Sequence, residues 1–261
     1  MFKRKYELDE NVFNEVNNES AYWIGYLYGD GNCTSENKIR LACAQKDKDI
    51  LIMFRSFIKC ISKPIKEYIS IGKYPACGFE IRSWKMKKCL DKYQLSLKKE
   101  KRGLINIDLM QDGVSKDFIR GLFDADGTFY YDGLHKNNLY AEITGYMPVM
   151  KSVLAILKHN KICSETKNIT KYGKIYRIRL ASSDCLKFGH FIYDGDPKFK
   201  LRRKFGMFKN HLDRLNETTQ MRSNSRNMYF RPMSDYNKGK KSEFKERKWF
   251  KEDKIKGDGD G

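Results

Sequence analysis

The chain has 261 residues, and its 52 Lys and Arg against 33 Asp and Glu give a formal net charge of +19. A content of 40% hydrophobic and 13% aromatic residues excludes a disordered chain, and the length allows one substantial domain or two small ones. Because so large a positive charge repels itself unless a polyanion binds, nucleic acid is the first partner to consider. A merely basic surface is the alternative.

Several other classes of protein are disfavoured by the sequence. The longest uninterrupted aliphatic and aromatic run, residues 50–54, is too short to span a membrane, and residues 1–10 have no apolar stretch typical of a signal peptide. The seven cysteines are scattered without a C-x-x-C pair, and the four histidines share no metal-ligand spacing with them, which argues against a zinc module. We therefore expect a cytoplasmic or organellar protein in a reducing compartment, neither secreted nor membrane-bound.

The chain contains an internal repeat. Residues 21–31 resemble residues 118–127, and the aspartates near their ends, Asp30 and Asp126, are 96 residues apart. Residue patterns that follow each aspartate match in order, and their offsets grow slowly, as the loops of a duplicated unit would.

The periodicity predicts the same elements in both repeats after an opening helix. In the first we expect a short segment after Asp30, a strand at 38–43, a helix at 46–61, strands at 65–71 and 79–83, and a helix at 85–93. In the second we expect strands at 127–131 and 139–144, a helix at 148–160, strands at 165–172 and 175–181, and a helix at 183–193. The prediction is an α+β protein with an N-terminal extension (1–19), a first αββαββα half (20–93), a linker (94–116), a second half (117–212) and a basic C-terminal extension (213–261).

Small residues repeat at a helical spacing in the two opening helices. Gly25 and Gly29 are four residues apart in the first, and Gly121 and Ala125 are four apart in the second. Residues at this spacing share a helix face, so the two helices can pack closer than the usual distance of ~8–10 Å. Their C-terminal ends would then lie side by side.

Asp30 and Asp126 would meet at these ends. Their like charges repel, and the helix dipole disfavours a negative charge there, so folding alone would avoid this arrangement. Divalent cations reverse the sign of both effects, and Mg²⁺ prefers a few carboxylate oxygens together with phosphate and water. A lone Asp-Gly pair is usually a turn, but the repeated pair predicts a site for metal-assisted phosphodiester hydrolysis.

Residues 23–31 and 119–127 resemble the two signature motifs of the monomeric LAGLIDADG homing endonucleases. The second motif is a close match, whereas the first departs at several letters, notably at Tyr28, where the family motif has its first aspartate. The similarity in layout covers roughly residues 20–212.

The resemblance implies a pseudo-twofold monomer whose two four-stranded antiparallel sheets form a saddle in the DNA major groove, with the motif helices between the halves. Asp30 and Asp126 match the metal-binding aspartates, and the backbone carbonyls of Gly29 and Ala125 are further candidate ligands for two or more Mg²⁺ ions. Family members cleave both DNA strands across the minor groove and leave 3′ overhangs. No small-molecule cofactor or membrane is expected.

The family also places a lysine near each site, where it can polarise the attacking water or stabilise the transition state. Residues 201–205 resemble the late motif of the second half, which points to Lys204. In the first half Lys98, Lys99 and Lys101 are all candidates, and we favour Lys99. The alternative role for these lysines is contact with the phosphate backbone alone.

Sequence readout would come from the strands. In an alternating strand one set of side chains packs beneath the helices and the other faces DNA, so Ile39 and Leu41 point inward. Arg and Lys suit guanine edges, and Glu suits cytosine, although a one-residue register slip would invert every assignment. The candidates for DNA contact are Lys38, Arg40, Lys66, Tyr68, Glu80, Arg82, Thr128, Tyr130, Glu142, Lys167, Lys171, Arg177 and Arg179.

These features predict a site-specific, Mg²⁺-dependent double-strand DNA endonuclease. The alternative is a non-cleaving nucleic-acid binder on the same fold, either an intron RNA maturase or a DNA-binding regulator. Such relatives of the family typically lose one or both aspartates, and this chain keeps both. From about Met221 the extension is rich in basic, polar and aromatic residues, which suits either a solvated tail or a DNA-contacting arm.

Overall fold

The computed structural model describes residues 5–70, 72–133 and 138–229, with side chains through residue 220. The chain divides into two compact units, residues 1–214 and 215–261. In the second unit the described residues, 215–229, belong to helix α7 (Arg202–Tyr229), so most of the candidate DNA-contacting arm lies outside the described residues. Among the helices of the described residues, none combines the length and the apolar character that crossing a bilayer requires.

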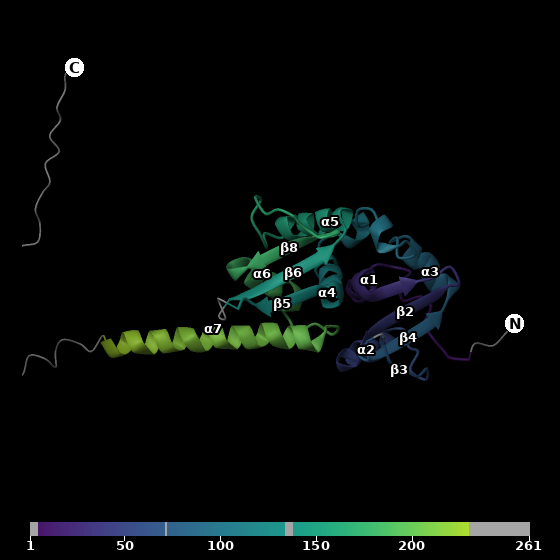
Figure 1. The fold of residues 1–261 in the computed structure, drawn as a ribbon, viewed down its shortest axis with the longest axis horizontal. Helices are drawn as coiled ribbons and strands as arrows, with labels where there is room; N and C mark the ends of the chain where they lie inside the picture. Colours follow the sequence, from purple (N-terminus) through teal and green to yellow (C-terminus); the bar gives the residue numbers. More distant parts are fainter. Residues whose placement is uncertain (1–4, 71, 134–137, 230–261) are drawn as a thin grey trace, which may run out of the picture. The chain divides into compact units, whose positions relative to one another are not determined.

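The first half follows the predicted order of elements (Figure 1). The short 3-10 turn η1 (Gln45–Asp47) precedes its second helix. Its helices and strands are α1 (Asn18–Asp30), β1 (Gly31–Cys33), β2 (Lys38–Ala44), α2 (Asp49–Phe57), β3 (Lys66–Ile69), β4 (Pro75–Arg82) and α3 (Trp84–Asp91).

The second half repeats this order after a linker that contains the 3-10 turns η2 (Lys99–Lys101) and η3 (Ile107–Leu109). Both halves lie within the same compact unit. The elements of the second half are α4 (Ser115–Asp126), β5 (Gly127–Tyr131), β6 (Leu139–Gly145), α5 (Met147–His159), β7 (Thr170–Tyr172), β8 (Ile175–Ala181) and α6 (Ser182–Tyr193).

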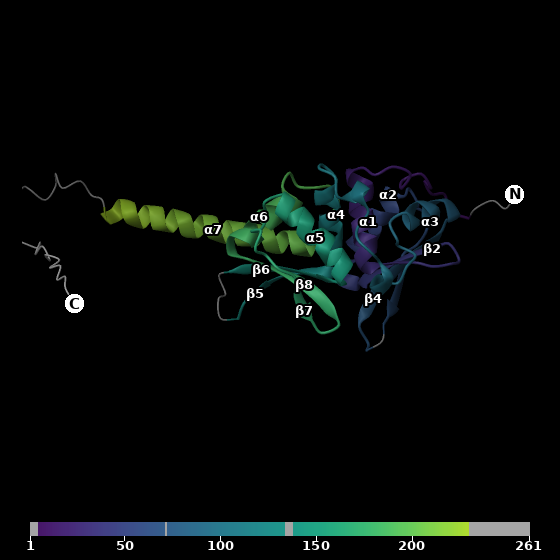
Figure 2. The same ribbon diagram turned by 90° about the horizontal axis from the view of Figure 1, so that it is seen from above.

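Each half carries a four-stranded antiparallel sheet, with strand orders β1-β2-β4-β3 and β5-β6-β8-β7. Figure 2 shows both sheets on the same side of helices α1 and α4. In β2 the buried Ile39 and Leu41 alternate with the exposed Arg40, as the period of a half-buried strand requires. The predicted α+β fold of two pseudo-symmetric αββαββα halves is confirmed.

The motif helices pack backbone to backbone. A Cβ atom built on Gly25 would lie 2.1 Å from the carbonyl oxygen of Phe118, and one built on Gly121 would lie 1.9 Å from that of Tyr22. No side chain fits at either position, because the atoms it would meet belong to the partner helix's backbone. The predicted small-residue interface is confirmed, and side chains such as Phe54 and Phe57, which pack against Trp23, complete the burial of residues 20–29 of α1.

Several predicted elements are shorter than expected, among them the strand expected at 65–71, which is β3 (Lys66–Ile69). The helix expected at 46–61 is the turn η1 followed by α2, because the buried Asp47 is held in the turn by hydrogen bonds from Arg203 Nε and Nη2, both 3.2 Å. The strand expected at 165–172 is limited to β7, because the Lys167 N–H donates to the Ser164 carbonyl (3.0 Å) and closes a turn before the strand.

Candidate active site and nucleic-acid interface

The two motif aspartates lie at the adjoining ends of α1 and α4. Asp30 is the last residue of α1, and Asp126 is the last residue of α4. A Cβ atom built on Gly29 would lie 2.2 Å from the Ala125 Cβ and 3.2 Å from the carboxyl carbon of Asp126. The close helix packing therefore carries through to the ends and brings the Asp126 side chain against the residue that precedes Asp30.

The environment of Asp30 disfavours its charged form. Although the side chain is exposed on one side, the surrounding protein removes much of its hydration and raises its pKa to about 6, and the negative charge of Asp126 adds to this effect. The charges of Lys99 and Lys204 and a hydrogen bond from Tyr26 oppose the rise. A cation bound between the carboxylates would reverse the two unfavourable effects.

Lys99 contacts the aspartate of the other half. Its ammonium lies 2.9 Å and 3.3 Å from the two carboxylate oxygens of Asp126, and its side chain is 43% exposed. The resemblance associated Lys99 with the first motif, but η2, which carries it, extends across to the end of α4. Neither Lys98 nor Lys101 hydrogen-bonds either motif aspartate among the described residues. Of the three candidates, Lys99 is the one that hydrogen-bonds a motif aspartate among the described residues, and its predicted catalytic role stays a prediction.

Lys204 caps the end of α4 instead of contacting a carboxylate. The buried ammonium donates to the carbonyl oxygens of Phe123, Asp124 and Gly127 at 2.6–2.7 Å. Burial lowers the Lys204 pKa to about 8. All three donors of this lysine are engaged, so the structure gives it a helix-capping role, and its predicted catalytic role stays a prediction.

Two buried neighbours of the motif ends, Arg102 and Asp124, were not predicted. The buried Arg102 donates from Nη1 to the Tyr28 carbonyl (2.7 Å) and so caps α1 much as Lys204 caps α4. Asp124 is fully buried and accepts hydrogen bonds from the Tyr22 and Tyr193 hydroxyls (2.9 and 2.7 Å) and from a backbone N–H. Asp124 is the first acid of the Asp-Ala-Asp sequence at residues 124–126. The neighbouring sequence does not distinguish a buried carboxylate that accepts hydrogen bonds from one that faces solvent.

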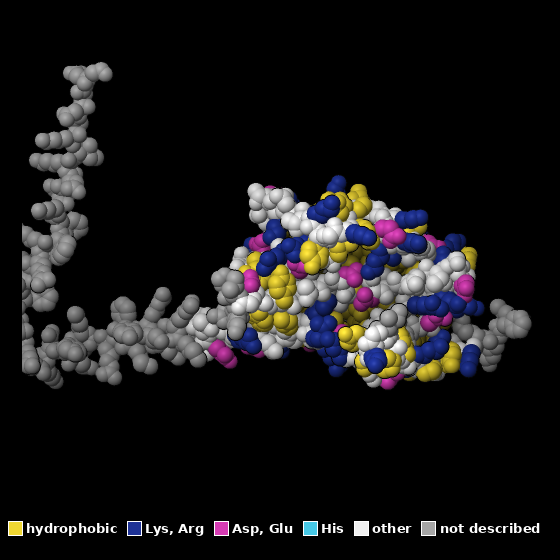
Figure 3. All heavy atoms as spheres, viewed as in Figure 1, with side chains coloured by type: hydrophobic (Ala, Val, Ile, Leu, Met, Phe, Trp, Pro, Cys, Tyr) yellow, Lys and Arg dark blue, Asp and Glu magenta, His cyan; other side chains and the backbone are white. Residues whose placement is uncertain are grey.

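The first sheet presents the predicted contact residues on its outward face. Register pairs Lys38 with Arg82 and Arg40 with Glu80, and it pairs the β3 candidates with small residues of β4. Lys66 lies opposite Gly78, and Tyr68 lies opposite Ala76, so both project from the outward face with Arg40. Figure 3 shows Lys and Arg side chains spread over the face that carries the two sheets.

The outward face of the second sheet is richer in aromatic contacts. Register aligns Thr128, Glu142 and Arg179 across β5, β6 and β8. The Arg179 guanidinium lies 4.4 Å from the Tyr140 ring centroid and 5.5 Å from that of Tyr130. Arginines on this face are thus held by stacking.

Further along β8, Arg177 hydrogen-bonds Glu142 (3.4 Å) and lies over the Tyr172 ring. Lys171 pairs in register with Tyr176, which packs against the core, so Lys171 starts from the other face of β7, and its predicted DNA contact stays a prediction. Three strand residues give too little alternation to fix the register from sequence. Lys167 lies in the preceding loop and lines a surface hollow with Arg177.

The motif ends offer two carboxylates, Asp30 and Asp126, that could hold a divalent ion. Among the described residues there is no group of three or more His, Cys, Asp and Glu side chains that could hold a metal. Two carboxylates, with the Gly29 and Ala125 carbonyls as further candidates, leave positions for water and phosphate, as Mg²⁺ sites usually do.

The duplicated αββαββα halves, joined through paired helices that each end in an aspartate, define the class: the chain has the LAGLIDADG homing endonuclease fold. The chain is similar to the solved structure of the I-LtrWI LAGLIDADG homing endonuclease bound to target DNA, at 13% identity and a TM-score of 0.50, covering 77% of this chain and 92% of that one. It is also similar to the LAGLIDADG meganuclease I-AabMI bound to uncleaved DNA (12%, TM-score 0.51, covering 79% and 92%). A further similar structure is the I-SmaMI LAGLIDADG homing endonuclease bound to cleaved DNA (14%, TM-score 0.50, covering 81% and 91%).

Sequence comparison adds one distant relative. Over 180 residues the chain is 24% identical to the replication factor C small subunit of Methanocaldococcus jannaschii, a match that covers 67% of this chain and 9% of that protein. No family model matches the chain. The similar solved structures confirm, at the level of the fold, the resemblance that the two motifs indicated.

Proposed function

We propose that this chain is a site-specific DNA endonuclease that hydrolyses both strands of a duplex target with Mg²⁺ and leaves 3′ overhangs. The observation that carries the proposal is the pair of motif aspartates, one from each half, at adjoining helix ends. Two sheets with basic outward residues flank these ends, and the similar solved structures contain DNA. The chain would act as a pseudo-twofold monomer without a small-molecule cofactor.

Asp30 and Asp126 would hold the divalent ions, together with the carbonyls of Gly29 and Ala125. The chemistry supplied by bound Mg²⁺ is an activated water and charge neutralisation on the attacked and leaving oxygens. Lys99, whose side chain is 43% exposed, holds its ammonium against Asp126, where it can donate to a water or a phosphate oxygen. Lys204 fixes the last turn of α4, so the orientation of Asp126 is set before DNA binds.

The outward residues of both sheets would bind the duplex. A chain with a net charge of +19 that neutralises many phosphates should bind with a steep salt dependence. Base contacts from the strands would then select the target.

The proposal is tested by incubating the full chain with a genomic or randomised duplex library in Mg²⁺ and mapping the cut ends. Recurrent double-strand breaks with 3′ overhangs at one sequence support it. Tight binding without cleavage would contradict the endonuclease and favour a maturase or a DNA-binding regulator. Cleavage without sequence preference would contradict site specificity.

A further inference from the structure

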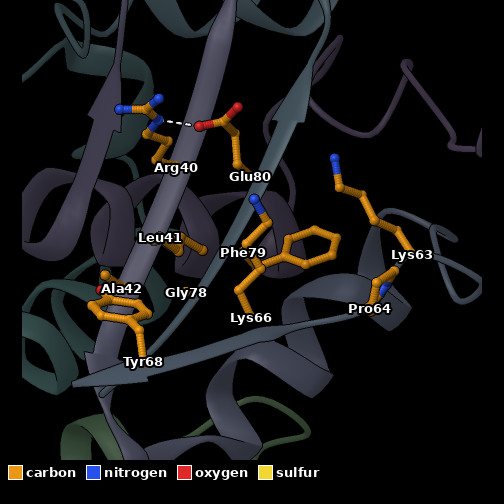
Figure 4. Close-up of a pocket in the computed structure, with 10 residues that line it drawn as sticks. All are labelled: Arg40, Leu41, Ala42, Lys63, Pro64, Lys66, Tyr68, Gly78, Phe79 and Glu80. Carbon is orange, nitrogen blue, oxygen red and sulfur yellow. Dashed lines mark hydrogen bonds and ion pairs between the residues drawn. The ribbon is translucent and has the colours of Figure 1, made fainter. Parts of the chain in front are cut away.

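The outward face of the first sheet contains a hollow of about 220 Å³ (Figure 4). Its floor is formed by Ala42 and Gly78, which lie opposite each other in β2 and β4 and have almost no side chain. The Tyr68 ring flanks it, close enough that a Cβ on Gly78 would lie 3.3 Å from Tyr68 Cε1. Because the floor side chains are short, a base edge can approach the sheet more closely here than at its neighbouring positions. We call this site the first-sheet hollow.

One wall of the first-sheet hollow is a fixed arginine. Arg40 and Glu80 are directly opposite each other, and Arg40 donates from Nε to the Glu80 carboxylate. Figure 4 shows the contact to Glu80 made through Nε, with one Nη atom directed away from Glu80 and neither Nη in that contact. Both side chains remain about half exposed, at 48% and 40%. The ion pair therefore restrains the guanidinium and leaves its Nη edge open to a ligand, which lowers the entropy lost on binding.

The charged groups around the first-sheet hollow are almost all hydrogen-bond donors. Arg40, Lys63 and Lys66 carry donors only, and Figure 4 shows both lysine side chains on the side of the sheet where Arg40 projects. Among the described residues that line the hollow, Glu80 is the sole carboxylate, and it is engaged by Arg40. A ligand edge that fits must therefore present acceptors.

We propose that the first-sheet hollow reads a guanine in the DNA major groove, with Arg40 Nη1 and Nη2 donating to guanine O6 and N7. Guanine is the base that offers two acceptors there, whereas adenine and cytosine each present an amino donor and thymine one acceptor with a methyl group. Glu80 is a positioning residue: it holds the arginine and does not contact the base. This replaces the expectation that Glu80 reads cytosine itself, and it rests on the proposed function.

The geometry makes an unusual prediction for the loss of Arg40. Arg40→Ala removes the donors and frees the Glu80 carboxylate, a strong acceptor for the amino groups of cytosine and adenine. The preference at that base pair should then change from guanine to an amino-bearing base. In the double variant Arg40→Ala/Glu80→Ala neither preference should remain.

The experiment is selection of bound duplexes from a randomised library by the full chain without added metal, followed by sequencing. We expect wild-type protein to prefer guanine by about 10–100-fold at one base pair of the first half-site. Arg40→Ala should lose that preference and gain one for cytosine or adenine at the same pair. Glu80→Ala should weaken it, and Glu80→Gln, which still accepts from Nε, should restore most of it.

Arg82→Ala is the matched control. Arg82 lies at the end of β4, the strand that carries Glu80; its side chain is 66% exposed and should contact phosphate. The substitution should weaken binding equally for all sequences. Failure of the wild-type chain to retain any duplex would overturn the proposed function itself. Retention of duplex with a guanine preference that survives Arg40→Ala, or a Glu80→Ala effect at a different base pair, would overturn this inference alone.

Discussion

The ends of the two motif helices are alike in backbone geometry and different in side-chain chemistry. A buried cation caps each, Arg102 on the Tyr28 carbonyl of α1 and Lys204 on the carbonyls of α4. Among the described residues Asp126 forms a salt bridge with Lys99, and Asp30 forms none. The fold therefore repeats the helix caps, because unpaired carbonyls at a buried helix end must be satisfied in either half, whereas the lysine contact is made on one side.

The residue two positions before each motif aspartate also differs between the halves: it is Asp124 in α4 and Tyr28 in α1. Asp124 ties α4 to α1 and α6 through two tyrosine hydroxyls, whereas Tyr28 packs against Phe118 and its buried hydroxyl has no hydrogen-bond partner among the described residues. A duplicated fold can thus lose a polar anchor in one half while keeping the aspartate beside it. The two helix ends share an aspartate, which we propose as a metal ligand, but they differ in its surroundings.

Removing either of the carboxylates proposed to bind metal should have the largest effect. Asp30→Asn and Asp126→Asn keep the side-chain size but lose the charge, so double-strand cleavage should fall at least about 100-fold in each. Plasmid linearisation in Mg²⁺ measures the loss, and a gel shift without Mg²⁺ should show binding largely intact. If both single variants still linearise the plasmid, these residues are not the site.

The next largest effect should come from the helix interface. Gly25→Leu and Gly121→Leu force a side chain into the partner backbone, so each should destabilise the protein by about 3 kcal/mol or more. Gly206→Ala is the control: this glycine lies in α7 with nothing within 4 Å of an added Cβ, and the change should be neutral or stabilising by about 0.5–1 kcal/mol. Unchanged melting temperatures for both leucine variants would contradict the close packing.

A matched pair of substitutions in α1 tests the difference in polar anchoring. Tyr22→Phe removes a 2.9 Å hydrogen bond to the buried Asp124 carboxylate and should cost about 1.5–3 kcal/mol. Tyr28→Phe removes a buried hydroxyl that has no partner among the described residues, so its cost should be about zero or slightly negative. Denaturant unfolding of the two variants compares them directly, and equal losses would mean that the two helix ends are anchored alike.

The sequence predicted the parts of this molecule that depend on local pattern. A four-residue spacing of small residues in each motif helix, beginning at Gly25 and at Gly121, predicted that the two helices pack closely. Strand alternation predicted that Ile39 and Leu41 point inward. The partner of Lys99 could not be predicted, because the loop that carries it crosses to the other half. The buried contacts of Asp124 likewise join residues up to 102 positions apart, and local periodicity contains no information about such pairs.

The smallest effect, and the sharpest test of the asymmetry, should come from Lys99. If its ammonium assists hydrolysis at the Asp126 site alone, Lys99→Ala should slow cleavage of one DNA strand by about 10-fold or more and leave the other strand less affected. Nicked plasmid would then accumulate before the linear form, and end-labelling each strand of the target would show which strand is slowed. Lys98→Ala is the matched control, since Lys98 precedes Lys99 in the chain, and among the described residues the ion pair with Asp126 is made by Lys99. Equal slowing of both strands would mean that Lys99 serves the two sites together, and the difference between the helix ends would then have no catalytic consequence.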